Sequence, residues 1–416
     1  MSELQETDFG NIPKSWNVKK ISDLKANDRR AIAMGPFGSN IKAENFVAEG
    51  VPVIRGTNLN YSRYVGGNFV YLKEEKADEL IGSNCKPGDL VFTHRGTIGQ
   101  VGLIPHGKHA RYVISQSGMK LSLNPDLMDS NFLLYFFKSE FGQYQILKYE
   151  SQVGVPSISN PLTSLKEIQV PVPKIEEQKA IASVLSSLDD KIDLLHRQNT
   201  TLERMAETLF RQWFVEEAQE DWEEKRIGDL VKVIDNRGKT PPYSDIPSDY
   251  PLIEVNALTG NNRLVDYSVI RKFVDEQTFK TWFRGHPKKY DSLLSTVGSI
   301  GEISMFLVEK GSIAQNVIAL SAVNICPIYL FEALKNIKDE IKELDIGSVQ
   351  PSIKVPHLLS LKIKIPSKAK IDNFSVIVKS YLEKMIVNYQ QIQTLEKLRD
   401  NLLPKLMSGD IRIQNG

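Results

Sequence analysis

Polar side chains that can form paired hydrogen bonds are frequent between the short apolar runs of this sequence. Arg and Lys can pair with guanine, and Asn and Gln with adenine, through the major groove of DNA. In the first half of the chain such residues are Asn40, Lys42, Arg55, Asn58, Asn60, Arg63, His94 and Arg95. In the second half they are Arg237, Lys239, Asn256, Asn262, Arg263, Arg284, Lys288 and Lys289. Because any solvated loop contains residues of these types, the whole set is the candidate for a DNA-reading surface, rather than any single member.

The segment FTHRGTIGQVG (92–102) combines three glycines with Thr, Arg and His, the composition of a phosphate-binding loop. Such a loop also needs a following helix N-terminus and usually a Gly-Lys-Ser/Thr sequence. Here the residues after Gly99 are strand-like, and no such sequence follows. We therefore predict a tight turn between two strands, with His94 and Arg95 on a variable surface.

Motifs that carry catalysis are also missing. KTPPYS (239–244) is similar to the Asp/Asn/Ser-Pro-Pro-aromatic motif of DNA amino-methyltransferases, but Thr240 is a poor substitute for the polar acceptor and no Gly-rich methyl-donor loop accompanies it. The six histidines include no ligand-spaced pair beyond HGKH (106–109), a weak metal signal in a turn. We expect no catalytic residue, no metal site and no cofactor bound by this chain.

Composition places the chain in a broad class. It has 416 residues, of which 41% are hydrophobic and 25% charged, as in globular proteins of two to three domains. No apolar run is long enough for a membrane span, and we expect no membrane partner. Cys85 and Cys326 lack Cys or His neighbours at ligand spacing, which favours a reducing, cytoplasmic location. The net charge of +1 is low for a protein that binds DNA unaided, so either DNA is not the ligand or a partner shares the phosphate contacts.

The chain consists of two similar halves, about 1–219 and 220–416. Five segments of the first half return in the same order in the second, which is not chance. The pairs are SWNVKKISDL (15–24) with DWEEKRIGDL (221–230), VPVIRGTNL (51–59) with YPLIEVNAL (250–258), GDLVFTHRGTIGQVG (88–102) with YDSLLSTVGSIGEIS (290–304), ISQSGMKLS (114–122) with IAQNVIALS (313–321), and VPSISNPLTSLKEIQVPVP (155–173) with QPSIKVPHLLSLKIKIP (350–366).

Each half begins with short β runs and one or two helices and ends in a long helix. We therefore predict two tandem α/β or α+β domains, at 1–173 and 220–366, and two long helices, at 174–219 and 367–416. Apolar residues recur along both helices in alternating steps of four and three, the pattern of a coiled-coil seam. The seam residues are Leu185, Leu188, Ile192, Leu195, Leu202, Leu209, Met385, Ile392, Leu395 and Leu402.

The long helices allow two interpretations. Each could be a core helix of its own domain, or the two could pack on each other as an antiparallel coiled coil with pseudo-twofold symmetry. A pattern of over four heptads favours the coiled coil, in which Asn199 and Asn388 would place amides in the seam. Arg399 also falls in the seam, where it fits less well.

Two variable domains, each followed by a similar long helix, resemble the specificity subunit of type I restriction–modification enzymes. The resemblance covers nearly the whole chain, although 367–377 departs from the Glu-Glu-Gln-x-x-Ile pattern of the first half. The resemblance rests on the segments IPKSWNVKKISDL (12–24), GDLVFTHRGTIGQVG (88–102) and LRDNLLPKLMSGDIRI (398–413). The most specific segment is PSISNPLTSLKEIQVPVPKIEEQKAIASVLSSLDDKID (156–193).

The resemblance implies two target-recognition domains that each read part of a double-stranded DNA site, and a coiled coil that spaces them and docks two methyltransferase subunits. Restriction/translocase subunits would join this complex. Catalysis, S-adenosylmethionine, ATP and magnesium would belong to the partners. Half-sites on one face of B-DNA would lie about 10 bp apart. Two other hypotheses remain: a self-contained methyltransferase or nuclease, and a coiled-coil adaptor whose domains bind protein.

Overall fold

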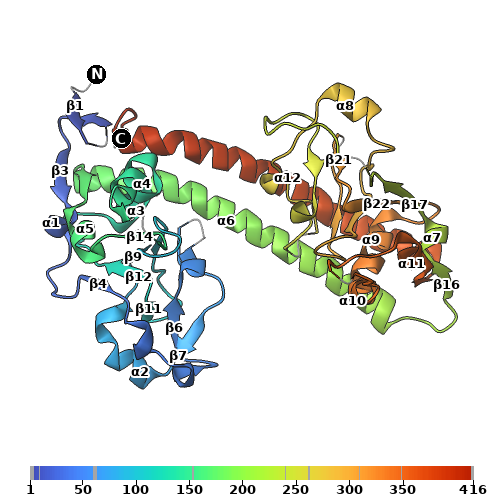
Figure 1. The fold of residues 1–416 in the computed structure, drawn as a ribbon, viewed down its shortest axis with the longest axis horizontal. Coiled ribbons are helices and arrows are strands. Elements are labelled where there is room, and N and C mark those ends of the chain that lie inside the picture. The colour runs from blue at the N-terminus through green and yellow to red at the C-terminus, as the bar shows by residue number, and fades with distance from the viewer. Residues whose placement is uncertain are drawn as a thin grey trace. The chain divides into compact units, whose positions relative to one another are not determined.

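A computed structural model describes residues 4–8, 10–59, 63–151, 154–238, 240–260, 263–308, 310–347 and 349–413 (Figure 1). The chain divides into two compact units of mixed helix and sheet. Unit 1 comprises Met1–Leu195 with Gln390–Gly416, and unit 2 comprises His196–Tyr389. The predicted domain boundaries assign the globular segments and the long helices to separate domains. Each unit instead combines a globular part with parts of both long helices, so the predicted boundaries remain untested. No helix in the described ranges is both long and apolar enough to cross a membrane.

Two sheets form the frame of unit 1. The first contains, in spatial order, the antiparallel strands β4 (Ile32–Met34), β12 (Gly118–Leu121), β9 (Leu90–Thr93) and β10 (Val101–Leu103). The second contains β5 (Phe46–Val47), β7 (Val70–Leu72), β6 (Val51–Ile54), β11 (Tyr112–Ile114) and β8 (Asn84–Cys85), and in it β6 and β11 are parallel. Every residue of β6, β9, β11 and β12 is buried, which explains why these strands are nearly continuous apolar runs in the sequence.

Short strand pairs and helices complete unit 1. The pairs are β1 (Leu4–Thr7) with β2 (Gly10–Pro13), β3 (Asn17–Lys20) with β15 (Gln169–Val172), and β13 (Glu150–Ser151) with β14 (Ser157–Ile158). The helices are α1 (Ile21–Leu24), α2 (Glu74–Glu79), α3 (Ser130–Lys138), α4 (Glu140–Leu147) and α5 (Pro161–Glu167). Asp129 begins α3 by accepting a hydrogen bond from the Phe132 amide at 2.9 Å, and the apolar run that follows lies in the core.

Unit 2 repeats the four-stranded sheet of unit 1 and the parallel strand pair of its second sheet. The strands β17 (Val231–Asp235), β22 (Val317–Ala322), β19 (Ser292–Ser295) and β20 (Ile303–Met305) follow the spatial order of β4, β12, β9 and β10. Likewise β18 (Leu252–Ile253) is parallel to β21 (Ser312–Ile313), and β16 (Glu223–Arg226) pairs with β23 (Lys362–Ile365). The helices are α7 (Ile227–Leu230), α8 (Glu276–Thr281), α9 (Pro327–Asn336), α10 (Lys338–Glu343) and α11 (Val355–Ser360). The repeat in the sequence is therefore a repeat of the fold.

The glycine-rich segment is a tight turn in both units, as predicted. It joins β9 to β10 and β19 to β20. Gly96 and Gly298 have φ angles of +83° and +86°, a region where a side chain is strained. Their amides donate to the carbonyl oxygens of Pro156 at 2.9 Å and Pro351 at 3.0 Å, so the turn is closed by protein groups.

The two long helices, α6 (Ile175–Arg211) and α12 (Lys368–Ser408), pack side by side in opposite directions within each unit (Figure 1). In unit 1, Ile192 and Leu195 of α6 form an apolar cluster with Ile392 of α12. Towards the ends, the same helices enter the domain cores, where Leu185 packs in unit 1 and Phe210 in unit 2. Both interpretations of the heptad pattern therefore hold: coiled coil in the middle and core helix at the ends.

Several polar side chains inside the helix pair bind one another. In unit 2 Asn388 Nδ2 donates to Asn199 Oδ1 at 2.8 Å. In unit 1 Arg399 Nη1 donates to Asp189 Oδ1 at 3.0 Å, and Tyr135 Oη donates to Asp189 Oδ2 at 2.7 Å. A buried carboxylate is tolerated only when paired and hydrogen-bonded, which this network supplies. The ion pair with Asp189 thus explains why an arginine is found at this seam position.

The segments that carry the family resemblance make close contacts within unit 1. Gln178 is fully buried and donates to the carbonyl oxygens of Pro173 at 2.9 Å and Leu127 at 3.1 Å. Gly409 lies so close to Pro13 that an added Cβ would stand 2.5 Å from Pro13 Cγ. The C-terminal segment therefore docks on the start of the chain.

The amide pair makes a prediction for stability. Asn388→Leu alone should destabilise the protein by about 1–3 kcal/mol, because it leaves the buried Asn199 amide without a partner. Changing Asn199 and Asn388 together to Leu should restore or raise the unfolding midpoint, because two apolar groups then meet in the seam. Urea denaturation of both variants measures this; an equally unstable double variant would contradict it.

Candidate nucleic-acid interface

The topology brings several loops of unit 1 to one end of its sheets. Strands β4 and β9 run towards this end and β12 starts from it, because neighbouring strands are antiparallel. The parallel strands β6 and β11 also finish there, since Ser115 N donates to Ile54 O at 2.9 Å. We call loops 35–42, 55–57, 94–97 and 115–117 the loop end of unit 1. The first of these loops lies against the last, because a Cβ added to Gly38 would stand 2.6 Å from Gln116 Oε1.

Four of the predicted residues are exposed at this loop end: Asn40, Lys42, Arg55 and Arg95. In the described part of the chain, no side chain forms an ion pair with Arg55 or Arg95. His94 also lies here but is only 7% exposed, and its Nε2 lies 3.1 Å from the Gln116 carbonyl oxygen. Burial lowers the pKa of His94, so this ring is neutral at neutral pH and supports the loop from inside.

Two further predicted residues of unit 1 lie in the protein interior. Asn58 is 1% exposed; its Nδ2 donates to the Gly66 carbonyl oxygen at 2.8 Å, and its Oδ1 accepts from the Arg55 amide at 2.9 Å. Arg63 is buried against α6, where it forms an ion pair with Asp190. The polar groups of both side chains bind protein, so neither presents them at the loop end.

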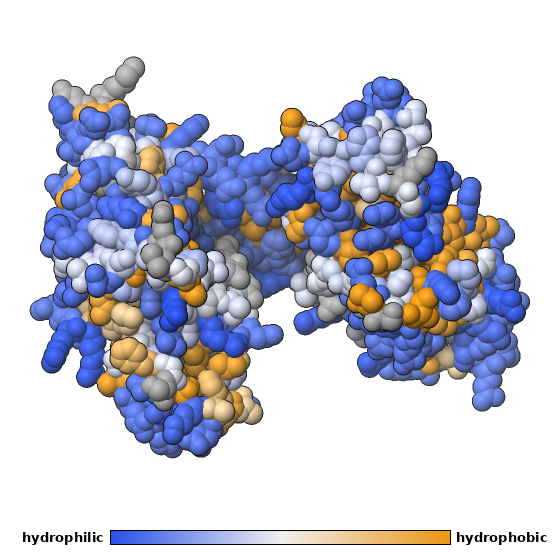
Figure 2. Space-filling model, in the orientation of Figure 1, coloured by the Kyte–Doolittle hydropathy of each residue, from blue (hydrophilic) through white to orange (hydrophobic). Residues whose placement is uncertain are grey.

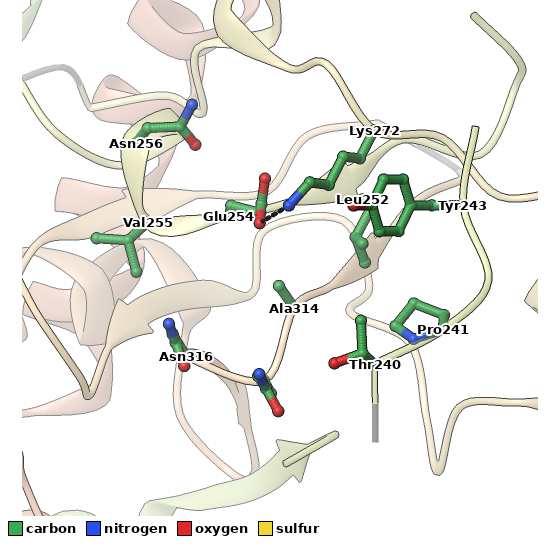
Figure 3. Close-up of a pocket in the computed structure, with 11 residues that line it drawn as sticks. Thr240, Pro241, Tyr243, Leu252, Glu254, Val255, Asn256, Lys272, Ala314 and Asn316 are labelled. Atoms are coloured by element: carbon green, nitrogen blue, oxygen red, sulfur yellow. Dashed lines mark hydrogen bonds and ion pairs between the residues drawn. The ribbon is translucent and has the colours of Figure 1, made fainter. Parts of the chain in front are cut away.

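Unit 2 has the equivalent loop end, formed by residues 236–238 and 240–243 and by loops 254–256, 296–299 and 314–316. Thr296 N donates to Asn316 O and Ala314 N to Ile253 O, both at 2.9 Å. A hollow of about 490 Å³ opens here (Figure 3). It is lined by Thr240, Pro241, Tyr243, Leu252, Glu254, Val255, Asn256, Lys272, Ala314, Gln315 and Asn316.

The cations near this loop end bind acceptors of the protein itself. Arg237 Nε donates to Asp235 at 2.8 Å, and Arg284 Nη1 reaches the Asp235 carbonyl oxygen at 3.3 Å. The pKa of Asp235 lies below its ordinary value, because burial, which raises it, is outweighed by the bonds and charge of Arg237. Lys272 Nζ donates to Glu254 Oε1 at 2.8 Å across the hollow (Figure 3).

The remaining predicted residues of unit 2 lie elsewhere. Asn256 is exposed at the loop end. Lys288 and Lys289 are exposed, but they precede β19 and therefore lie at the opposite end of the sheet. Arg263 is 1% exposed and forms an ion pair with Glu332 of α9. Predicted residues Asn60, Lys239 and Asn262 lie outside the described residues.

Arg63 and Arg263 occupy equivalent positions in the two units. The Arg63 carbonyl oxygen accepts from Leu103 at 3.0 Å, and that of Arg263 accepts from Met305 at 2.7 Å. Burial lowers the pKa of Arg263 to about 10, and the nearby carboxylates of α6 oppose this shift. Both arginines thus anchor the strand frame, Arg63 to α6 and Arg263 to α9.

Residues that the sequence analysis did not select also face the loop ends. Gln116 and Gln315 are both exposed. They occupy equivalent positions in the sequence repeat, and this equivalence could have identified them as candidate site residues. Phe37 is 77% and Tyr243 52% exposed, each in a loop that follows the first strand of its sheet. Hydrophilic residues cover most of the visible face of each unit, with apolar residues scattered among them (Figure 2).

The predicted seam residues lie along the packed helices. Leu185, Ile192, Leu195, Met385 and Ile392 are buried, and Leu188, Leu202, Leu209, Leu395 and Leu402 are half-buried. At two positions the next residue takes the buried place, since Asp189 and Phe210 are more buried than Leu188 and Leu209. An α-helix drifts from the heptad repeat, which explains this shift.

Within the described ranges, no three His, Cys, Asp or Glu residues are grouped so that they could hold a metal ion. In the HGKH turn, His109 packs edge-on against Tyr112, with ring centroids 5.3 Å apart. His109 therefore belongs to an aromatic cluster.

Each half of the chain matches a known protein family. A model of the type I restriction modification DNA specificity domain matches residues 13–204 and again residues 219–397. The chain belongs to this family. The double match coincides with the repeated topology, and the expected role of a non-catalytic specificity subunit in DNA target recognition is thereby confirmed.

Relatives support this along the whole length. The MjaIX specificity subunit of a type I restriction enzyme from Methanocaldococcus jannaschii is 27% identical over 99% of this chain and 97% of its own. The putative MjaX specificity subunit of the same organism is 23% identical over 99% of this chain and 97% of its own. The crystal structure of a type I S subunit from M. genitalium covers 98% of this chain and 99% of its own, with a TM-score of 0.61 and 20% identity, and so has the same fold.

The buried arginine of unit 2 can be tested as a structural residue. Arg263→Met should destabilise the protein by about 3–5 kcal/mol, because Glu332 is left as an unpaired buried charge. The double variant with Glu332→Met should recover most of this loss. Chemical denaturation measures both, and a fully stable single variant would mean that the ion pair is dispensable.

Acidification gives a second test. Burial lowers the pKa of His94 below its ordinary value of 6.5, so the unfolded chain binds this proton more readily than the folded one. Stability should therefore fall as the pH drops below about 6.5. His94→Gln should flatten this slope, leaving the part due to His286, whose pKa burial also lowers. Urea midpoints between about pH 7.5 and 5.5 measure it; an unchanged slope would argue against this role.

Proposed function

We propose that each unit reads one half of a bipartite, gapped DNA site in the major groove, and that α6 and α12 set the gap. The observation that carries the proposal is the repeated frame with two unlike loop ends. Arg55 and Arg95 are exposed on one, and Asn256 and Gln315 on the other. A rigid scaffold that presents different side chains in equivalent loops suits the recognition of two different half-sites.

The helix pair suits the role of a spacer. The amide pair Asn199–Asn388 and the ion pair Asp189–Arg399 lie inside it, where polar partners fix the register of two helices. A fixed register implies a fixed gap between half-sites, and two sites on one face of B-DNA lie about 10 bp apart, centre to centre.

The complex we propose includes two methyltransferase subunits, which restriction subunits join, in the cytoplasm. A net charge of +1 favours partners that share the phosphate contacts. Exposed apolar side chains on the long helices, Met205, Val376 and Leu398, suit a docking surface for the methyltransferases. S-adenosylmethionine, ATP and magnesium would be bound by these partners.

Mapping of methylated adenines tests the proposal. A host that expresses this gene with its neighbouring methyltransferase should methylate a gapped, two-part motif, and deletion of this gene should abolish it. The control is a host with the methyltransferase alone. An unchanged methylation pattern after deletion, with active methyltransferase, would leave the site-reading role without support.

A further inference from the structure

The cations of the two loop ends differ in what they bind. In unit 1 the guanidinium groups of Arg55 and Arg95 are exposed, and in the described ranges neither forms an ion pair. Arg55 stands beside β9, because a Cβ added to the adjacent Gly56 would lie 3.7 Å from Thr93 Cγ2. Arg95 directly follows His94, whose ring is held by Gln116. Two exposed guanidinium groups therefore lie at the same loop end of unit 1.

In unit 2 two cations of the loop end, Arg237 and Lys272, are bound to carboxylates, whereas the exposed Arg284 donates from Nη1 to the Asp235 carbonyl oxygen at 3.3 Å. Arg237 donates three hydrogen bonds to the Asp235 carboxylate, from Nε to both oxygens and from Nη2 to one. Lys272 pairs with Glu254 and lies over the Tyr243 ring, 4.9 Å from its centroid. Releasing either cation for DNA would leave a carboxylate behind, facing a negatively charged ligand.

Amide side chains line the hollow of unit 2 and are available for hydrogen bonding. Gln315 is exposed and Asn316 half-buried at the start of β22, and both line the hollow. Asn256 is exposed on the facing loop, and its Nδ2 makes one long contact of 3.4 Å to the Val269 carbonyl oxygen. In Figure 3, Asn256 and Asn316 lie on the side of the hollow away from Pro241 and Tyr243.

We infer that the half-site of unit 1 contains guanine read by Arg55 or Arg95, and that the half-site of unit 2 is read at adenine by amides. This inference rests on the proposed function and specifies its substrate. A guanidinium donates to both O6 and N7 of guanine. An amide donates to N7 of adenine and accepts from its N6, which a guanidinium cannot do.

Selection from a random duplex library tests this, using the full chain in complex with its methyltransferase subunits. The wild-type complex should select a gapped motif. Arg55→Gln or Arg95→Gln should weaken the preference for a G·C pair in one half by roughly 5- to 150-fold and leave the other half unchanged. Gln315→Leu, or Asn256→Leu, should weaken the preference for an A·T pair in the other half only.

Two matched controls separate base reading from phosphate contact. Arg29→Gln changes an exposed arginine that precedes β4, at the opposite end of the sheet, and should alter neither half. Arg237→Gln should also keep the base preference, because Arg237 is bound to Asp235. A uniform loss of affinity in Arg55→Gln and Arg95→Gln, or a unit 1 half-site without guanine, would overturn the inference while the proposed function stands. A wild-type complex that selects no gapped motif would overturn both.

Discussion

The apolar face of α6 is covered by different partners along its length, and the rest of the structure depends on this. A long amphipathic helix gains most of its stability from packing, so an uncovered stretch would fray. Leu185 packs in the core of unit 1, Ile192 meets Ile392 of α12, and Phe210 packs in the core of unit 2. One helix therefore contributes apolar residues to two hydrophobic cores.

The duplicated frame separates stability from recognition. Strands such as β9 and β12 are buried throughout, and their equivalents β19 and β22 repeat them almost completely. The loops at their ends carry the differences, because exposed side chains there bear little of the packing energy. Two copies of one scaffold can thus present different sets of side chains in equivalent loops without a change of fold.

Periodicity and repetition were enough to predict the architecture, because they report on burial within one element or between equivalent ones. Two tandem domains, the tight turn at Gly96 and the long helices follow from such patterns. The position of a polar side chain does not. Arg63 and Arg263 are in loops and Asn58 is in a short 3-10 helix between strands, yet all three are buried.

The reason is that their partners are distant in the sequence. Arg63 meets Asp190 and Arg263 meets Glu332, and no local pattern links these pairs. Lys288 and Lys289 illustrate a second limit, since only the strand direction of β19 reveals which end of the sheet a loop occupies. Comparison of the two halves was a better guide to the exposed loop residues. Gln116 and Gln315 occupy equivalent positions in the repeat, and both are exposed at the loop ends.

The docking of the C-terminal segment has a consequence for synthesis on the ribosome. Unit 2 is one continuous stretch, His196–Tyr389, whereas unit 1 draws on both ends of the chain. Leu406 and Met407 belong to the same core as Phe132. The core of unit 1 is therefore completed only after the whole of unit 2 has been synthesised, because Leu406 and Met407 follow His196–Tyr389 in the sequence. Until then the apolar residues around Phe132 lack the contacts that Leu406 and Met407 supply.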